Sequence, residues 1–266
     1  MKTALLILLV ALSNYCQASD SPIRHILTST ILSENQEITV YLPDTYNSEK
    51  SKHYPVLYIL DGEINGDLAA SMFRRMHLSE GSNEHIVIAI HSSDRLRDYA
   101  PTINNDPRGP VGKGGGGDKF LDYLEAELIP DVDKQFRTLN ERVFAGHSIA
   151  GLLVLHSFHS RPHLFQAHLA FSPAVWWSER ETLKATQKYV LSDKDINNYL
   201  YLNIGSEGGE MRVVYDSLVQ TISKNRTLDL SLRTDEFDYE GHGLTLAAGL
   251  YNAFKGLYKY QQSKGL

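Results

Sequence analysis

Cysteine is nearly absent from this chain of 266 residues, since Cys16 is the only one. A single cysteine cannot form a disulfide within the chain, so stability has to come from a buried core, which a chain of this length can build. Basic residues do not predominate either: 26 lysines and arginines face 32 aspartates and glutamates, which gives a net charge of −6. This mildly acidic balance, without a basic run, gives no reason to expect a nucleic acid as partner.

Long hydrophobic runs are also missing, apart from residues 4–12. That run is too short to cross a bilayer as a helix. Lys2 precedes it and a small-x-small triplet follows it. This order predicts a signal peptide over residues 1–18, cleaved after Ala18, and therefore an exported protein that is periplasmic or secreted, with no membrane span. Lipidation of Cys16 is a weaker alternative, because the two residues before it are not small. Cleavage would also remove the only thiol.

Short runs of apolar and β-branched residues alternate with longer stretches of helical periodicity. This alternation predicts an α/β fold with a mostly parallel central sheet and helices on both faces. No linker or repeat divides residues 19–266, which we expect to form a single domain. The predicted strands are residues 38–42, 55–60, 86–90, 142–145, 167–171, 199–204 and, near the sheet edge, 230–237. The predicted helices are residues 120–136, 149–158, 211–222 and 245–258.

Residues 100–118 are the one long irregular segment, with three prolines and a run of glycines. Glycines beside Lys113 raise the possibility of a phosphate-binding loop, but that motif needs a serine or threonine directly after the lysine. Gly114 stands there instead. The segment is therefore predicted to be a surface loop, and a lid or a pocket wall is the functional alternative, because long loops in compact domains are often functional.

A serine lies between a predicted strand and a predicted apolar helix. The segment 146–151 reads Gly-His-Ser-Ile-Ala-Gly, and a sharp turn from strand to helix is the context that a nucleophile elbow requires. Small residues two positions before and after the serine relieve the crowding at such a turn, and Gly146 and Ala150 occupy these positions. The pattern predicts Ser148 as a nucleophile.

A serine hydroxyl is a weak nucleophile unless a neighbouring base takes its proton. In an α/β-hydrolase the chain order is serine, then acid, then histidine. Four of the five histidines after Ser148 follow it closely, whereas His242 lies late in the chain, between Gly241 and Gly243, after the last predicted strand. This position predicts His242 as the general base.

The acid of such a site orients the histidine and stabilises its protonated form. We expect it on the loop after the predicted strand 199–204, which offers Glu207 and Glu210. Glu207 is favoured because it lies nearer to the strand end, and Glu210 is the alternative. The oxyanion of the reaction needs two backbone N–H donors. They are predicted to be those of Ile149 and Glu63.

Three histidines at helical spacing raise the alternative of a metal site. His156, His159 and His163 would share a helix face, but Pro162 ends the helix before the third, and no carboxylate completes the set. A metal site needs a full ligand set in a fixed geometry. The sequence is therefore interpreted as having no metal site.

Several short motifs resemble those of the "Putative esterase" family, which includes siderophore esterases, esterase D, feruloyl esterases and mycolyltransferase antigens. The resemblance extends over nearly all of the chain after residue 18 and is nearest to the siderophore-esterase branch. It implies an α/β-hydrolase that cleaves carboxylic esters without a cofactor, and it carries the roles named above onto Ser148, His242, Ile149 and Glu63. The motifs that carry it are Leu60-Asp61-Gly62, Asp94 to Thr102, Glu127 to Pro130, Gly146-His147-Ser148, Ser172 to Trp177 and Gly241-His242-Gly243.

Two of these motifs supply candidates for a substrate pocket. Arg95, Arg97, Trp176 and Trp177 would suit an aromatic or anionic acyl group, with buried ion pairs and core packing as the alternatives. The favoured interpretation is an exported serine esterase acting on siderophore-type or other small-molecule esters. An acyltransferase of the same fold and an exported binding protein without catalysis are the rivals.

Overall fold

The computed structural model describes residues 21–192 and 195–266. The predicted signal peptide and its cleavage site lie outside these ranges. Within them, no helix combines the length and the apolar character that crossing a membrane would require.

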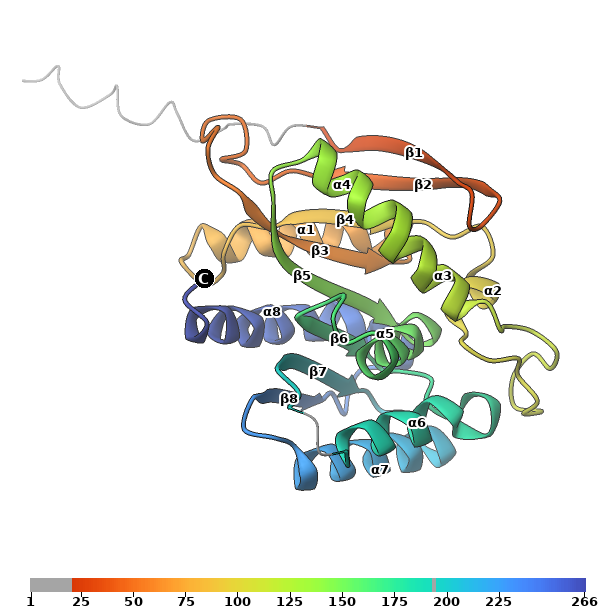
Figure 1. Cartoon of the computed structure of the whole chain (residues 1–266). Helices are drawn as coiled ribbons and strands as arrows, with labels where there is room; N and C mark the ends of the chain where they lie inside the picture. The colour runs from red at the N-terminus through yellow and green to blue at the C-terminus, as the bar shows by residue number, and fades with distance from the viewer. Residues whose placement is uncertain (1–20, 193–194) are drawn as a thin grey trace, which may run out of the picture.

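One eight-stranded sheet runs through the described part of the chain (Figure 1). The strand order is β1-β2-β4-β3-β5-β6-β7-β8, in which β2 is antiparallel to both of its neighbours and the strands from β4 to β8 are parallel. The predicted α/β fold with a mostly parallel sheet is confirmed. The strands are β1 (Ile23–Ser29), β2 (Glu34–Tyr41), β3 (Tyr54–Leu60), β4 (Ile86–Ile90), β5 (Thr138–His147), β6 (Ala167–Phe171), β7 (Asn198–Ile204) and β8 (Leu230–Glu236).

Helices cover both faces of the sheet (Figure 1). The helices α1 (Gly62–His77) and α8 (Thr245–Ser263) pack on one face. The other face carries α3 (Gly117–Tyr123), the π-helical turn η1 (Leu124–Leu128), α4 (Ile129–Gln135), α5 (Ile149–Ser160), α6 (Trp177–Val190) and α7 (Gly209–Asn225). Two short helical segments follow strands β4 and β8, namely α2 (Arg95–Tyr99) and the 3₁₀ turn η2 (His242–Leu244).

The central strands are apolar along their whole length because both of their faces are buried. Successive side chains of a strand point to opposite faces. In β3, Tyr58 and Leu60 therefore join the core beneath α3 to α7, whereas Leu57 and Ile59 join the core beneath α1 and α8.

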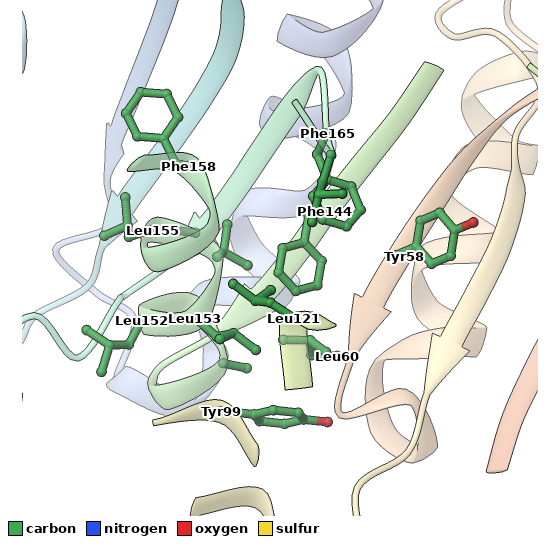
Figure 2. Packing of buried hydrophobic residues seen from close by; sticks show 14 of the residues in the cluster. Tyr58, Leu60, Tyr99, Leu121, Phe144, Leu152, Leu153, Leu155, Phe158 and Phe165 are labelled. Atoms are coloured by element: carbon green, nitrogen blue, oxygen red, sulfur yellow. The ribbon is translucent and has the colours of Figure 1, made fainter. Parts of the chain in front are cut away.

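The larger core lies between the sheet and α5 (Figure 2). Leu152, Leu153 and Leu155 of α5 are fully buried. Beside them the rings of Phe144 and Phe165 stack, with centroids 4.6 Å apart and an interplanar angle of 11°. This packing fixes α5, and therefore the turn that precedes it, against the centre of the sheet.

Replacing Phe144 by alanine is expected to lower the free energy of unfolding by about 3–5 kcal/mol, because it leaves a cavity in a fully buried site. Urea denaturation measures this loss. Leu191→Ala is the control, since Leu191 is 59% exposed and its truncation should cost about 0.5 kcal/mol or less. A loss below about 1 kcal/mol for Phe144→Ala would contradict the packing described here.

Two buried histidines and one half-buried histidine make the stability of the fold sensitive to acid. Burial lowers the pKa of His85, His159 and His168 to about 4, whereas unfolded histidine titrates near 6.5. Below about pH 6.5 the unfolded chain therefore binds more protons than the fold does, and acid favours unfolding.

We expect stability to be highest above pH 6.5 and to decline as the pH falls towards about 4. Urea denaturation across this range measures the decline. His168→Gln should make it shallower, because one of the buried groups is gone. His53→Gln, which changes an exposed histidine, should leave it unchanged. Stability that does not vary between pH 7 and pH 4 would contradict this prediction.

The loop expected at residues 100–118 is anchored on the start of α6. The indole N–H of Trp177 donates to the carbonyl of Thr102 at 2.8 Å, and Ser178 Oγ donates to the carbonyl of Ile103 at 2.7 Å. Ile103 and Gly114 form an isolated antiparallel bridge. The loop is irregular, as predicted, but it is held in one place by hydrogen bonds from α6.

Candidate active site

Ser148 lies at the sharp turn between β5 and α5. Its backbone has φ 60° and ψ −115°, a strained conformation for a residue with a side chain. A Cβ at Gly146 would come within 2.7 Å of the carbonyl carbon of Ala150, so only glycine fits there. The backbone N–H of Ser148 donates to the carbonyl of Phe171 at 2.9 Å. The turn is therefore fixed to β6, and Ser148 is half-buried.

The late histidine reaches this serine from the loop after β8. His242 Nε2 lies 2.9 Å from Ser148 Oγ, and its other ring nitrogen, Nδ1, lies 2.8 Å from Glu207 Oε1. Both distances are those of hydrogen bonds. With Nδ1–H donating to the carboxylate, Nε2 is free to accept the serine proton. The structure brings the three predicted residues into one hydrogen-bonded chain.

Glu207 is held by more than its contact with His242. Its side chain is 9% exposed. Ser172 Oγ donates to Oε1, and the N–H of Gly205 donates to Oε2 at 2.6 Å. Burial raises the pKa of the Glu207 carboxyl, but the hydrogen bonds from Ser172, His242 and Gly205 outweigh burial and leave the pKa below its usual value. An ionised carboxylate in this position stabilises a protonated His242.

Glu210, the alternative acid, turns away from the histidine. Its Oε2 lies 2.6 Å from Arg108 Nη1, and its Oε1 is hydrogen-bonded to Arg180. Glu207 lies on the loop after β7 and is bonded to His242, whereas Glu210 is the second residue of α7. Ser172 was not among the predicted site residues, although it is the first residue of the Ser172 to Trp177 motif.

Both predicted oxyanion donors lie in the first turns of helices. Ile149 is the first residue of α5, and Glu63 is the second residue of α1. N–H groups in a first helical turn have no partner within the helix and favour negative charge. Asp61, just before α1, has φ 53° and ψ 49°. A Cβ at Gly62 would come within 2.5 Å of the backbone of Ala89, so this turn lies tightly against β4.

Two of the four predicted pocket residues, Trp177 and Arg97, have partners elsewhere in the fold. Trp177 is 3% exposed and packs in the larger core, and its buried indole N–H is paired with the carbonyl of Thr102. Arg97 is hydrogen-bonded to Asp98 at 2.6 Å and to Glu34. The burial of Trp177 corrects its prediction as a pocket residue, because its side chain contributes to the core. Arg97 forms ion pairs, and its role in a pocket stays a prediction.

The other two predicted pocket residues are Trp176 and Arg95. Trp176 is half-buried, and a Cβ at Gly109 would come within 2.9 Å of its ring. Arg95 binds Asp61 through Nε at 2.7 Å and Nη2 at 3.1 Å, and Nη2 also donates to the carbonyl of His147 at 3.0 Å. Arg95 therefore contacts both the turn at Asp61 and the residue directly before Ser148.

The three histidines considered as metal ligands each have another partner. His156 binds Asp118 at 2.8 Å, His163 binds Glu125 at 2.9 Å, and His159 lies 3.0 Å from Thr186 Oγ1. Within residues 21–192 and 195–266, no group of three or more histidine, cysteine, aspartate or glutamate side chains is arranged to hold a metal ion.

Comparisons with known proteins agree with the fold and with an ester hydrolase. The family model described as "Putative esterase" matches residues 29–243. The ferri-bacillibactin esterase BesA of Bacillus subtilis is 26% identical over 234 residues, which cover 79% of this chain and 80% of that protein. A siderophore triacetylfusarinine C esterase of Aspergillus fumigatus is 32% identical over 152 residues, which cover 53% of this chain and 51% of that protein.

The crystal structure of an IroE-like serine hydrolase from Shewanella oneidensis superposes with a TM-score of 0.84 at 26% identity. The match covers 90% of this chain and 80% of that one. The α/β-hydrolase fold that the sequence predicted is confirmed. The chain belongs to the "Putative esterase" family, and it is a serine ester hydrolase.

Proposed function

We propose that this enzyme hydrolyses small-molecule carboxylic esters through an acyl-enzyme on Ser148. His242 is the general base, and Glu207 is the acid that orients it. The observation that carries this proposal is the hydrogen-bonded chain from Ser148 Oγ to His242 at 2.9 Å and from His242 to Glu207 at 2.8 Å. Nucleophile, base and orienting acid in hydrogen-bond contact are the arrangement that activates a serine.

In the first half of the reaction, Ser148 Oγ attacks the ester carbonyl carbon while its proton passes to His242 Nε2. The carbonyl oxygen takes up the negative charge, and the N–H groups of Ile149 and Glu63 donate to it. Protonated His242 is stabilised by the Glu207 carboxylate. When the tetrahedral intermediate collapses, the bond to the leaving alcohol breaks, and His242 returns the proton to that alcohol.

In the second half, a water molecule gives its proton to His242 and attacks the acyl carbon. The same two N–H groups stabilise the second tetrahedral intermediate. The bond to Ser148 then breaks, Oγ regains a proton from His242, and the carboxylic acid leaves.

The proposed substrates are siderophore-type esters. The support is the similarity of this chain to proteins described as siderophore esterases. Trp176 is the pocket candidate that we retain, because its half-buried ring lies beside the 100–118 loop and offers an apolar face to an aromatic acyl group.

A panel of esters tests this substrate class. The purified enzyme is compared on siderophore lactones, feruloyl esters, acetyl-sugar esters and p-nitrophenyl butyrate. We expect kcat/KM for a siderophore ester to exceed the values for feruloyl and acetyl-sugar esters by about 10-fold or more, since discrimination is set by contacts in the transition state. Hydrolysis of p-nitrophenyl butyrate without hydrolysis of any siderophore ester would overturn the substrate class and leave the esterase in place.

The same assay separates hydrolysis from acyl transfer. With an added alcohol or sugar acceptor, we expect the free acid as the only acyl product. A new ester formed with the acceptor would show that this acceptor competes with water for the acyl-enzyme, and it would favour the acyltransferase alternative.

We also infer that the enzyme acts after export. The support is the basic residue, apolar run and small-x-small triplet within residues 1–18. Sequencing of the amino terminus of the exported protein should find Ser19 first. A protein that stays in the cytoplasm with its first 18 residues in place would contradict export.

A further inference from the structure

We propose that Arg95 and His147 form a brace, here called the Arg95–His147 brace, that fixes the positions of three loops of the catalytic site relative to one another. These loops are the turn at Asp61, the elbow at Ser148 and the loop of His242. The inference rests on the proposed function, because it assigns a positioning role within that same site.

The first arm of the brace joins the oxyanion turn to the elbow. Arg95 binds both carboxylate oxygens of Asp61, at 2.7 and 3.1 Å, and also donates to the carbonyl of His147 at 3.0 Å. Asp61 lies two residues before Glu63, the proposed oxyanion donor, and His147 lies directly before Ser148. One guanidinium therefore connects the turn that carries one oxyanion donor with the turn that carries the nucleophile and the other donor.

The second arm joins the elbow to the loop of the base. His147 Nε2 lies 2.8 Å from the backbone carbonyl of His242, and the two rings have centroids 4.6 Å apart. A carbonyl oxygen only accepts, so Nε2–H is the donor. Burial lowers the pKa of His147 to about 4, which keeps this ring neutral at pH 7 and avoids a second positive charge beside His242.

The geometry of Arg95 needs a guanidinium. Its planar fork makes two hydrogen bonds to one carboxylate and a third to a carbonyl, which a lysine ammonium on a single stem cannot reproduce. The Asp61 side chain is 9% exposed and that of Arg95 is 39% exposed. The ion pair is thus closed to solvent on the side of the carboxylate.

The brace acts through the residues that it positions. Neither Arg95 nor His147 has a hydrogen bond to Ser148 Oγ or to the His242 ring in the described structure. The brace sets the spacing of two backbone donors, a nucleophile and a base, and a misplacement of about 1 Å in such a set costs roughly 100-fold in rate. Loss of the brace should therefore lower kcat for any ester, whatever its charge.

The test compares Arg95→Gln, Arg95→Lys, Asp61→Asn and the Asp61→Asn/Arg95→Gln double variant on neutral p-nitrophenyl butyrate. We expect both Arg95 variants to lose about 10- to 100-fold in kcat, with KM changed less than about threefold. The double variant should fall no further than Arg95→Gln, because both changes break the same contact. Arg74→Gln is the matched control, since Arg74 pairs with Asp44 at 2.8 Å and is similarly exposed; it should keep full kcat.

The second arm is tested by rescue. His147→Phe keeps a ring but loses the donor to the His242 carbonyl, and it should lower kcat by about 10-fold. His147→Gln can place an amide N–H near the position of Nε2 and should restore most of that loss. Circular dichroism and thermal unfolding verify that each variant is folded. Should Arg95→Gln fail to fold, Arg95→Lys, which keeps the charge, decides the first arm.

Two different failures can be distinguished. If Ser148→Ala is as active as the wild type, the proposed function is wrong, and the brace falls with it. If Ser148→Ala is inactive but both Arg95 variants keep full kcat on the neutral ester, the brace alone is wrong. A rise in KM confined to anionic esters would instead assign Arg95 to substrate binding.

Discussion

Replacing Ser148 by alanine is expected to lower kcat for p-nitrophenyl butyrate by about 10⁴-fold or more, because the members of such a triad act as a unit. His242→Ala should cause a loss of similar size, and the double variant should lose no more than the single ones. The structural reason is the 2.9 Å contact between His242 Nε2 and Ser148 Oγ, without which neither group performs its step. Steady-state kinetics with the purified enzyme measures each loss.

Ser160→Ala is the matched control for this comparison. Ser160 is the last residue of α5, is exposed and bonds the carbonyl of His156, so its loss should leave kcat unchanged. Circular dichroism verifies that each variant keeps the wild-type fold. Equal activity in the wild type, Ser148→Ala and His242→Ala would show that nucleophile and base are assigned wrongly, and the alternative of a binding protein would gain support.

The second large effect on kcat is expected from replacing Glu207, the proposed acid. Glu207→Gln is expected to lower kcat by about 10³- to 10⁴-fold while the geometry stays intact, because a neutral amide neither fixes the tautomer of His242 nor stabilises its protonated form. Glu210→Gln changes a residue of the same type three positions later, but Glu210 is the second residue of α7 and binds Arg108 and Arg180. We expect the kcat of Glu210→Gln to fall by about 10-fold or less, because this change leaves the electrostatic stabilisation of the transition state in place.

The pair of variants decides between the two glutamates. If Glu210→Gln loses more activity than Glu207→Gln, the assignment of the acid is reversed. If both variants keep full activity, the site works as a Ser148–His242 dyad. In either case the hydrogen bonds to Glu207 from Ser172 and Gly205 would serve to hold the loop after β7.

The proposed nucleophile and base were predictable from the sequence because each lies in a recognisable local pattern. A strand, a tight turn with small flanking residues and an apolar helix predict an elbow wherever they occur. The order of the chain then selected His242 among the later histidines. The central strands β3 to β7 were predictable for a similar reason, since both of their faces are buried and their sequences are continuously apolar.

Elements with weaker local patterns were missed. β1 is an edge strand with exposed apolar residues, among them Ile26 at 64%. Its apolar residues therefore do not mark a buried face, and the sequence lacks the apolar–polar alternation that would predict a strand. α1 begins with Gly62 and contains Gly66, and it exposes Ile64 at 75%. Glycine and an exposed apolar side chain both obscure a helical pattern. The positions of these segments depend on packing against the sheet.

The wider site could not be predicted, because its contacts join residues far apart in the chain. Ser172 meets Glu207, and Arg95 meets Asp61 and His147, only after the loops at the carboxyl ends of β3, β4, β5, β6 and β7 have come together. Parallel strands bring such loops to one edge of the sheet. The sequence motif indicated Arg95 as a candidate site residue, but its contacts with Asp61 and His147 could be seen only in the folded structure.

Covalent labelling tests the central claim most directly. The purified enzyme is treated with diisopropyl fluorophosphate, and the modified peptide is mapped by mass spectrometry. The proposed mechanism predicts one adduct on Ser148, with labelling strongly slowed in His242→Ala because the serine then lacks its base. A folded, ester-hydrolysing enzyme that is not labelled, or is labelled at another residue while Ser148 stays unmodified, would contradict the assignment of Ser148 as the nucleophile.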